Sequence, residues 1–219
     1  MVAFKGVRNH RIAQGSAALL LTVLAVAALA AQASGGGVGT LRCGPHSSEV
    51  ETLARGPELR VYTGLETGGL QWVRACGPAL PRAVRVGPSR PGGKRWFARI
   101  HQVVVRDFWI AAVEHQVEGT DWGSVWLRVF EARSRHLSRC DLGGWAQFDD
   151  RKFRLLLSPK GNLAWVSARS GERVLGVCDR RSELTILDED PTLDLQSVRL
   201  DGSLLRWTDA TGEHSRTLT

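Results

Sequence analysis

The fold of this protein is decided by residues 153–187, which read FRLLLSPKGNLAWVSARSGERVLGVCDRRSELTIL. Short runs rich in Val, Leu and Trp alternate there with Gly, Pro, Asp and Ser, residues that suit the backbone angles of tight turns. This alternation predicts β-strands joined by turns. We expect a meander of four antiparallel strands, at residues 154–157, 163–166, 174–178 and 184–187.

Three further segments can be laid on this template, at residues 60–86, 103–137 and 198–218. A tryptophan recurs near one template position in three of the four units, and we expect these side chains in the core: Trp109, Trp165 and Trp207. No stretch of the chain past the N-terminal segment has the pattern of an amphipathic helix. The sequence therefore predicts an all-β fold of antiparallel four-stranded meander repeats.

The best unit resembles the repeat of TolB-type and WD40-like β-propellers. The family's repeat consists of Ser-Pro-Asp-Gly, a strand, a Gly turn and two more strands. The unit in this chain consists of LLLSPKGNLAWV, a Gly turn, VLGVCD and LTIL. The other units lack the Ser-Pro pair, and among them only the last keeps an Asp-Gly turn, at Asp201 and Gly202. The resemblance implies a blade-like meander, and it implies no particular function because propellers serve many.

The last unit ends after its third strand, at Thr217. Residues 40–43 could supply the missing outer strand and close a β-propeller-like ring of about four blades. An incomplete ring, or a sandwich made of the same meanders, is the alternative. Closure or cover is needed in each case because an unpaired strand edge invites aggregation.

The N-terminal segment has the pattern of a secretory signal peptide. Lys5, Arg8 and Arg11 form a basic head, residues 17–31 form an uncharged apolar run, and Ala31-Gln32-Ala33 is a small-x-small exit. We therefore expect a signal peptide at 1–33, a Gly-rich linker at 34–39 and the β-domain at 40–219. The alternative is a surface protein that residues 17–31 anchor in the membrane. The excess of Arg over Lys indicates a GC-rich bacterial genome.

Four cysteines follow the expected cleavage site: Cys43, Cys76, Cys140 and Cys178. An even count in an exported chain predicts two disulfides, and three connectivities are open. The cysteines have no CxxC or CxxxC spacing, so we expect no zinc or iron–sulfur site. In the alignment of the units, Cys76 and Cys178 lie on third strands, and Cys43 and Cys140 lie at or just after fourth strands. That register favours the pairs 43–76 and 140–178, each joining neighbouring blades.

Neither the charge pattern nor any short motif predicts a catalytic residue, a cofactor or a metal ligand. The chain has 29 Lys and Arg against 22 Asp and Glu, a formal net charge of +7. No basic run exceeds two residues, so we expect a solvated surface and no nucleic-acid partner. Glu114 and His115 are adjacent on an expected strand and so point to opposite faces, which excludes them as a dyad. We expect surface or turn positions for the histidines of the exported chain: His46, His101, His115, His136 and His214.

Two acidic clusters, at residues 149–150 and 188–190, are expected in loops. Glycosidases need two carboxyl groups that flank a glycosidic bond, so a secreted glycan hydrolase that uses these loop carboxylates is an alternative function.

Trp96 and Trp145 lie between units, beside Arg95 and Gly144. Exposed tryptophans in such places can stack on sugar rings or anchor a protein partner, whereas buried ones fill gaps between sheets. The sequence favours an exported, non-catalytic module that binds or scaffolds a protein or glycan partner.

Overall fold

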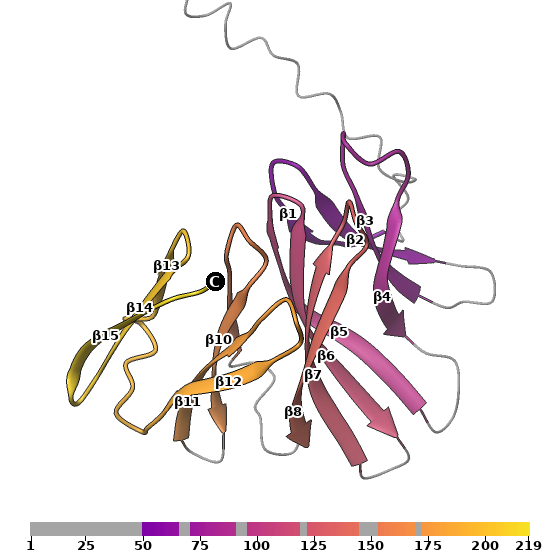
Figure 1. Ribbon diagram of the computed structural model, residues 1–219. Helices are drawn as coiled ribbons and strands as arrows, with labels where there is room; N and C mark the ends of the chain where they lie inside the picture. Colours follow the sequence, from indigo (N-terminus) through magenta and orange to yellow (C-terminus); the bar gives the residue numbers. More distant parts are fainter. Residues whose placement is uncertain (1–49, 66–70, 91–95, 119–121, 145–152, 170–171) are drawn as a thin grey trace, which may run out of the picture. The chain divides into compact units, whose positions relative to one another are not determined.

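The computed structural model describes residues 50–65, 71–90, 96–118, 122–144, 153–169 and 172–219, all of which belong to one compact unit, Leu41–Thr219. Its described elements are β-strands, and they form four antiparallel sheets that follow one another along the chain (Figure 1). In every sheet the strands pair in sequence order, so each sheet is a simple meander. The predicted all-β fold of meander repeats is confirmed.

The first sheet contains β1 (Thr52–Arg55), β2 (Arg60–Leu65), β3 (Gln71–Cys76) and β4 (Val84–Arg90). The second sheet contains β5 (Trp96–Arg106), β6 (Trp109–Glu118), β7 (Trp122–Glu131) and β8 (Leu137–Gly144). The third sheet contains β9 (Arg154–Leu157), β10 (Leu163–Arg169), β11 (Glu172–Cys178) and β12 (Leu184–Glu189). The fourth sheet contains β13 (Arg199–Asp201), β14 (Leu204–Asp209) and β15 (Gly212–Thr217).

Each predicted unit therefore corresponds to one sheet, and the third sheet matches its prediction most closely. The fourth sheet has three strands, as expected. The first and last strands of the first two sheets extend beyond their predicted units. Arginine and glycine interrupt the apolar alternation there, as in β4 (VRVGPSR) and β8 (LSRCDLGG).

Three apolar clusters join consecutive sheets. One cluster joins the first sheet to the second, another joins the second to the third, and a further one joins the third to the fourth. Strand β6 contributes to two of these clusters. Ile110 and Ala112 belong to the cluster between the first and second sheets, and Ala111 and Val113 belong to the cluster between the second and third sheets. Successive strand residues point to opposite faces, so a continuous apolar run suits a strand that is covered on both sides.

The recurring tryptophans are core residues, as predicted. Trp165 is fully buried, and Trp109 and Trp207 are buried as well. Trp165 packs its ring 5.9 Å from that of Phe153 and lies opposite Gly176 on β11. A Cβ atom at Gly176 would come within 2.7 Å of the Trp165 indole, so the glycine makes room for the ring.

Ring closure stays a prediction. Residues 40–43, which were expected to complete the fourth sheet, lie outside the described residues. Within the part of the chain that the structure describes, none of the apolar clusters joins the first sheet to the fourth.

Gly161 is expected to be irreplaceable in the turn between β9 and β10. Its φ is +82°, and an added Cβ would lie 2.4 Å from the Trp109 ring. We expect Gly161→Ala to cost about 2–4 kcal/mol of unfolding free energy, from the left-handed backbone and the overlap with a packed ring. Urea denaturation measures this loss.

Gly202→Ala is the matched control, because Gly202 also has a positive φ, of +60°, but an added Cβ would meet nothing within 4 Å. It should cost only about 1–2 kcal/mol. Equal losses for the two variants would show that contact with Trp109 is unimportant.

Candidate functional site

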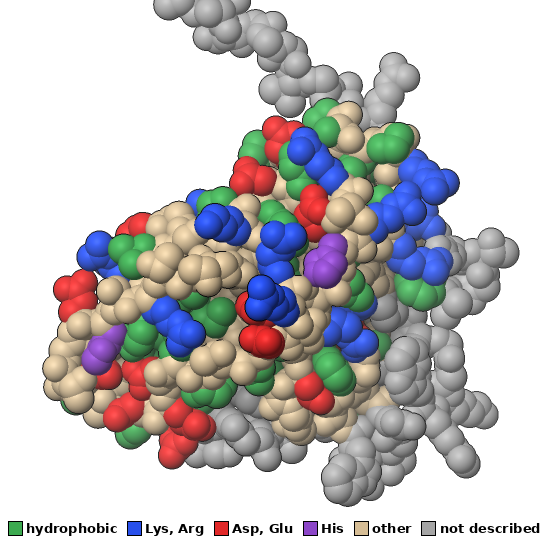
Figure 2. Space-filling view, viewed as in Figure 1, with side chains coloured by type: hydrophobic (Ala, Val, Ile, Leu, Met, Phe, Trp, Pro, Cys, Tyr) green, Lys and Arg blue, Asp and Glu red, His purple; other side chains and the backbone are tan. Residues whose placement is uncertain are grey.

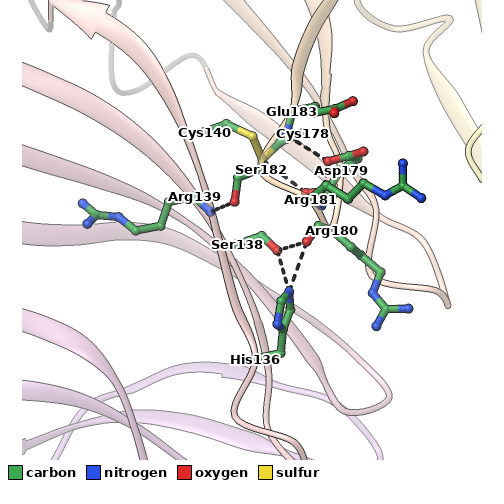
Figure 3. Close-up of a disulfide and its surroundings, with 10 residues drawn as sticks. All are labelled: His136, Ser138, Arg139, Cys140, Cys178, Asp179, Arg180, Arg181, Ser182 and Glu183. Atoms are coloured by element: carbon green, nitrogen blue, oxygen red, sulfur yellow. Dashed lines mark hydrogen bonds between the residues drawn. A yellow bond between two sulfur atoms is a disulfide. The ribbon is translucent and has the colours of Figure 1, made fainter.

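A disulfide fastens the second sheet to the third. It joins Cys140 on β8 to Cys178 on β11, with the two Cα atoms 5.9 Å apart, and both cysteines are buried (Figure 3). This is one of the two predicted pairs, and it links a fourth strand to the third strand of the next sheet, as the unit alignment required. Cys76, on β3, is also disulfide-bonded. Cys43 lies outside the described residues, so the 43–76 pair stays a prediction.

Hydrogen bonds around this disulfide tie β8 to the turn between β11 and β12 (Figure 3). The Ser138 hydroxyl donates to the Arg180 carbonyl oxygen at 2.6 Å, and His136 Nε2 lies 3.1 Å from the same oxygen. The Arg139 amide donates to the Ser182 hydroxyl at 3.0 Å. These contacts give His136 a structural role at an exposed turn, in keeping with its prediction.

A cavity of about 770 Å³ is lined by β3, β4, β7 and β8, which belong to the first and second sheets. On the face that Figure 2 shows, blue side chains gather at the upper right, over the first sheet. The polar side chains among the described lining residues are a tryptophan and five arginines: Trp72, Arg74, Arg82, Arg85, Arg128 and Arg135. The other described lining residues are apolar or glycine.

All six polar side chains of this lining are hydrogen-bond donors. A guanidinium carries five N–H groups and accepts nothing, and an indole has one N–H donor. The Nε1 atom of Trp72 is buried and has no hydrogen-bond partner within the described structure. The cavity therefore suits a ligand that is rich in acceptor oxygens and negatively charged.

Arg128 forms the buried floor of the cavity. Its side chain is 10% exposed, and its Nη1 donates to the carboxylate of Glu114 on β6. A Cβ atom at Gly87 on β4 would lie 2.4 Å from the same nitrogen, so a glycine is needed for the guanidinium to fit. Burial lowers the pKa of the Arg128 guanidinium from its ordinary value, and the charge of Glu114 opposes that shift. An arginine nevertheless stays charged at neutral pH.

Glu114 is the acidic partner beneath this floor, and it is 1% exposed. Besides Arg128, its carboxylate lies 3.6 Å from Arg139 Nη2 and accepts from Gln116 Nε2 at 2.5 Å. The Arg139 guanidinium also lies over the Trp126 ring, 4.4 Å from the ring centroid. A single buried carboxylate thus orients two arginines of the second sheet.

Trp72 and Arg85 form one wall of the cavity. The Arg85 guanidinium lies 3.5 Å from the centroid of the Trp72 ring, close enough for a cation–π contact. Stacking holds a guanidinium by its face and so restricts its motion in the cavity wall.

Two tryptophans, Trp96 and Trp145, were predicted as candidate ligand-stacking residues. Trp96 begins β5, but its side chain lies outside the described residues, as does the whole of Trp145. Their proposed role in ligand stacking stays a prediction. Among the described lining residues the tryptophan is Trp72, to which the sequence assigned no role because it does not recur among the units.

The acidic clusters need one correction. Asp188 and Glu189 are not loop residues but the end of β12, because the strand continues past the apolar run of residues 184–187. Asp188 accepts a hydrogen bond from Trp207 Nε1 at 3.0 Å, and its pKa is raised above the ordinary value, chiefly by burial. Asp149 and Asp150 lie outside the described residues, so the hydrolase alternative stays untested.

His115 is a second correction. It was expected at the surface or in a turn, yet it lies in β6 and is buried, because this strand is covered on both sides. His214, by contrast, is partly exposed and lies 3.0 Å from Asp209 beside the hairpin turn of β14 and β15. No group of three or more His, Cys, Asp or Glu side chains in the described ranges could hold a metal ion.

The arginine cavity itself was missed. Its five arginines are scattered between positions 74 and 135, so no basic run announces them. The sequence predicted a solvated basic surface, and it gave no sign that these arginines line one cavity. One signal was available, since residues 50–144 contain 14 basic and 9 acidic residues whereas residues 153–219 contain 9 and 10. A charge asymmetry of this kind indicates a binding surface for anions.

No family model, curated protein or solved structure matches this chain. Among the described residues there is also no helix that is long and apolar enough to cross a membrane.

Proposed function

We propose that this protein is an exported, non-catalytic binding module whose arginine-lined cavity takes an anionic ligand. The observation that carries the proposal is the donor-only lining, with five guanidinium groups and an indole N–H among the described residues. Carboxylate, sulfate and phosphate groups match guanidinium donors in charge and in planar or tripod geometry. A volume of about 770 Å³ suits a ligand of several sugar or amino-acid units.

Export is supported by two independent features. A structural disulfide such as Cys140–Cys178 persists in oxidising compartments and is rare in the cytosol. Residues 1–33 have the pattern of a signal peptide. An acidic glycan or the acidic surface of a protein partner is therefore the expected ligand.

Titration calorimetry with three probes tests this function: a galacturonate oligosaccharide, a sulfated heparin fragment and neutral maltohexaose. We expect at least one of the acidic probes to bind, with an affinity that falls as salt is added, and the neutral probe not to bind. Binding of maltohexaose as tight as that of the acidic probes would contradict the proposal, and so would no binding by either acid.

Arg128→Gln is expected to weaken binding of the acidic probe at least tenfold, because a hydrogen bond to a charged group contributes about 1.5–3 kcal/mol. Arg206→Gln is the matched control. Arg206 lies on β14 in the fourth sheet and forms a half-exposed pair with Glu213. Affinity should be unchanged in this control, and circular dichroism should show both variants folded. Equal effects of the two substitutions would place the ligand elsewhere.

A further inference from the structure

One arginine of the cavity is paired with a buried carboxylate, which a simple basic pocket lacks. Glu114 lies behind Arg128, bonded to Nη1 of that guanidinium. None of the described residues that line the cavity carries a negative charge, and Glu114 is adjacent to the cavity through its contact with Arg128. Without a bound anion, the charge of Arg128 is therefore compensated by Glu114.

Arg128 has hydrogen-bonding capacity left after this pairing. Its Nε atom is buried and has no partner in the part of the chain that the structure describes. Arg128 nevertheless lines the cavity while its Nη1 holds Glu114. An anion in the cavity would therefore lie near both Arg128 and Glu114, and its negative charge would repel that of Glu114.

We infer that Glu114 is the internal counter-ion of the anion site, which stabilises Arg128 in the empty cavity and competes with the ligand for it. The inference rests on the proposed function. It assigns Glu114 a regulatory role at the site, since its charge limits affinity and favours ligands whose other acidic groups reach the rim arginines. Arg82 and Arg135 are the rim arginines meant here. Both line the cavity and are exposed, in the loops that join β3 to β4 and β7 to β8.

This role predicts opposite effects of one substitution on stability and on binding. Glu114→Gln keeps the shape of the side chain and an oxygen that can accept from Arg128, but it removes the charge. The empty protein should become less stable, because a buried guanidinium loses its counter-ion. Affinity for the acidic probe should rise about tenfold, the order of effect of removing one unit charge close to a partly buried site.

The experiment is a thermal-unfolding series of wild type, Glu114→Gln and the double variant Glu114→Gln/Arg128→Gln, each with increasing inorganic sulfate or galacturonate oligosaccharide. A ligand that binds only the folded state stabilises it by RT ln(1 + L/Kd) at free ligand concentration L, so at equal ligand concentration a tighter ligand raises the melting temperature more. We expect the largest ligand-induced shift for Glu114→Gln and the smallest for the double variant. If Glu114→Gln does not fold alone, its rescue by the galacturonate oligosaccharide but not by neutral maltohexaose is the equivalent result, because sulfate stabilises folded proteins in general.

Asp188→Asn is the matched control, because Asp188 is another partly buried, hydrogen-bonded carboxylate but lies in the third sheet. Whatever its effect on stability, it should not enlarge the ligand-induced shift. A Glu114→Gln variant that is destabilised but has no larger ligand-induced shift than wild type would show a purely structural Glu114, and that result would overturn the inference while wild-type binding still stood. Absence of binding by wild type would instead refute the proposed function.

Discussion

Replacing Trp165 with alanine is expected to lower the free energy of unfolding by about 3–5 kcal/mol, as for other fully buried aromatic residues. The side chain is 0% exposed, and it belongs to the apolar cluster between the second and third sheets. Phe153, just before β9, and Gly176 on β11 lie against the Trp165 ring, and β9 and β11 are the two strands that flank β10. No small shift of the sheet can fill the volume that the indole leaves, so a cavity remains.

Urea denaturation followed by far-ultraviolet circular dichroism measures this loss. Trp126→Ala is the control, because Trp126 is only partly buried on β7, with its Nε1 donating to Ser124 Oγ at 2.9 Å. Its loss should be less than half that of Trp165→Ala. Similar losses at the two positions would show that the Trp165 site is not the centre of a packed core.

Removal of the Cys140–Cys178 disulfide is the second change that we expect to lower the free energy of unfolding strongly. Replacing both Cys140 and Cys178 with alanine should cost about 3–4 kcal/mol on the chain-entropy estimate, since the bond closes a loop between residues 38 positions apart. Both cysteines are buried, so reductant should act on the folded protein far more slowly than on the unfolded protein.

Non-reducing peptide mapping of the exported protein, with free thiols alkylated, identifies the bonds directly. It should recover the Cys140–Cys178 peptide pair that the structure contains, together with the pair Cys43–Cys76 that the unit alignment predicts. An N-terminus at Ser34 in the same map would support export with cleavage. A pair that joins Cys43 or Cys76 to either of the other two would contradict the arrangement of the sheets.

The strands and turns of the third sheet were predictable because their information is local. The turn at Pro159–Asn162 contains residues that few other conformations favour, and Gly161 adopts the left-handed angles that such a turn needs. The strands between the turns have enough apolar residues to identify them. β1 and the outer parts of β4 and β8 were harder to predict from the sequence, because a strand at a sheet edge does not need a continuous apolar pattern.

Burial on β6 was only partly predictable. The run of apolar residues from Trp109 to Val113 indicated a strand, but it did not show that Glu114 and His115 continue into the interior. Those positions are buried because another sheet covers each face of β6, and the paired arginine makes a carboxylate tolerable there. A rule that assigns charged residues to the surface fails wherever a partner comes from another strand.

The sequence by itself determined the all-β class, the four meander units, the core tryptophans and the register that pairs Cys140 with Cys178. All of these follow from turn chemistry and from the two-residue period of strands, which act over a few residues. Only the tertiary structure decided where the arginines meet and which carboxylate lies behind them. That arrangement depends on which sheet faces cover each other, and packing of residues far apart in the chain sets this, from Trp72 on β3 to Arg135 after β7.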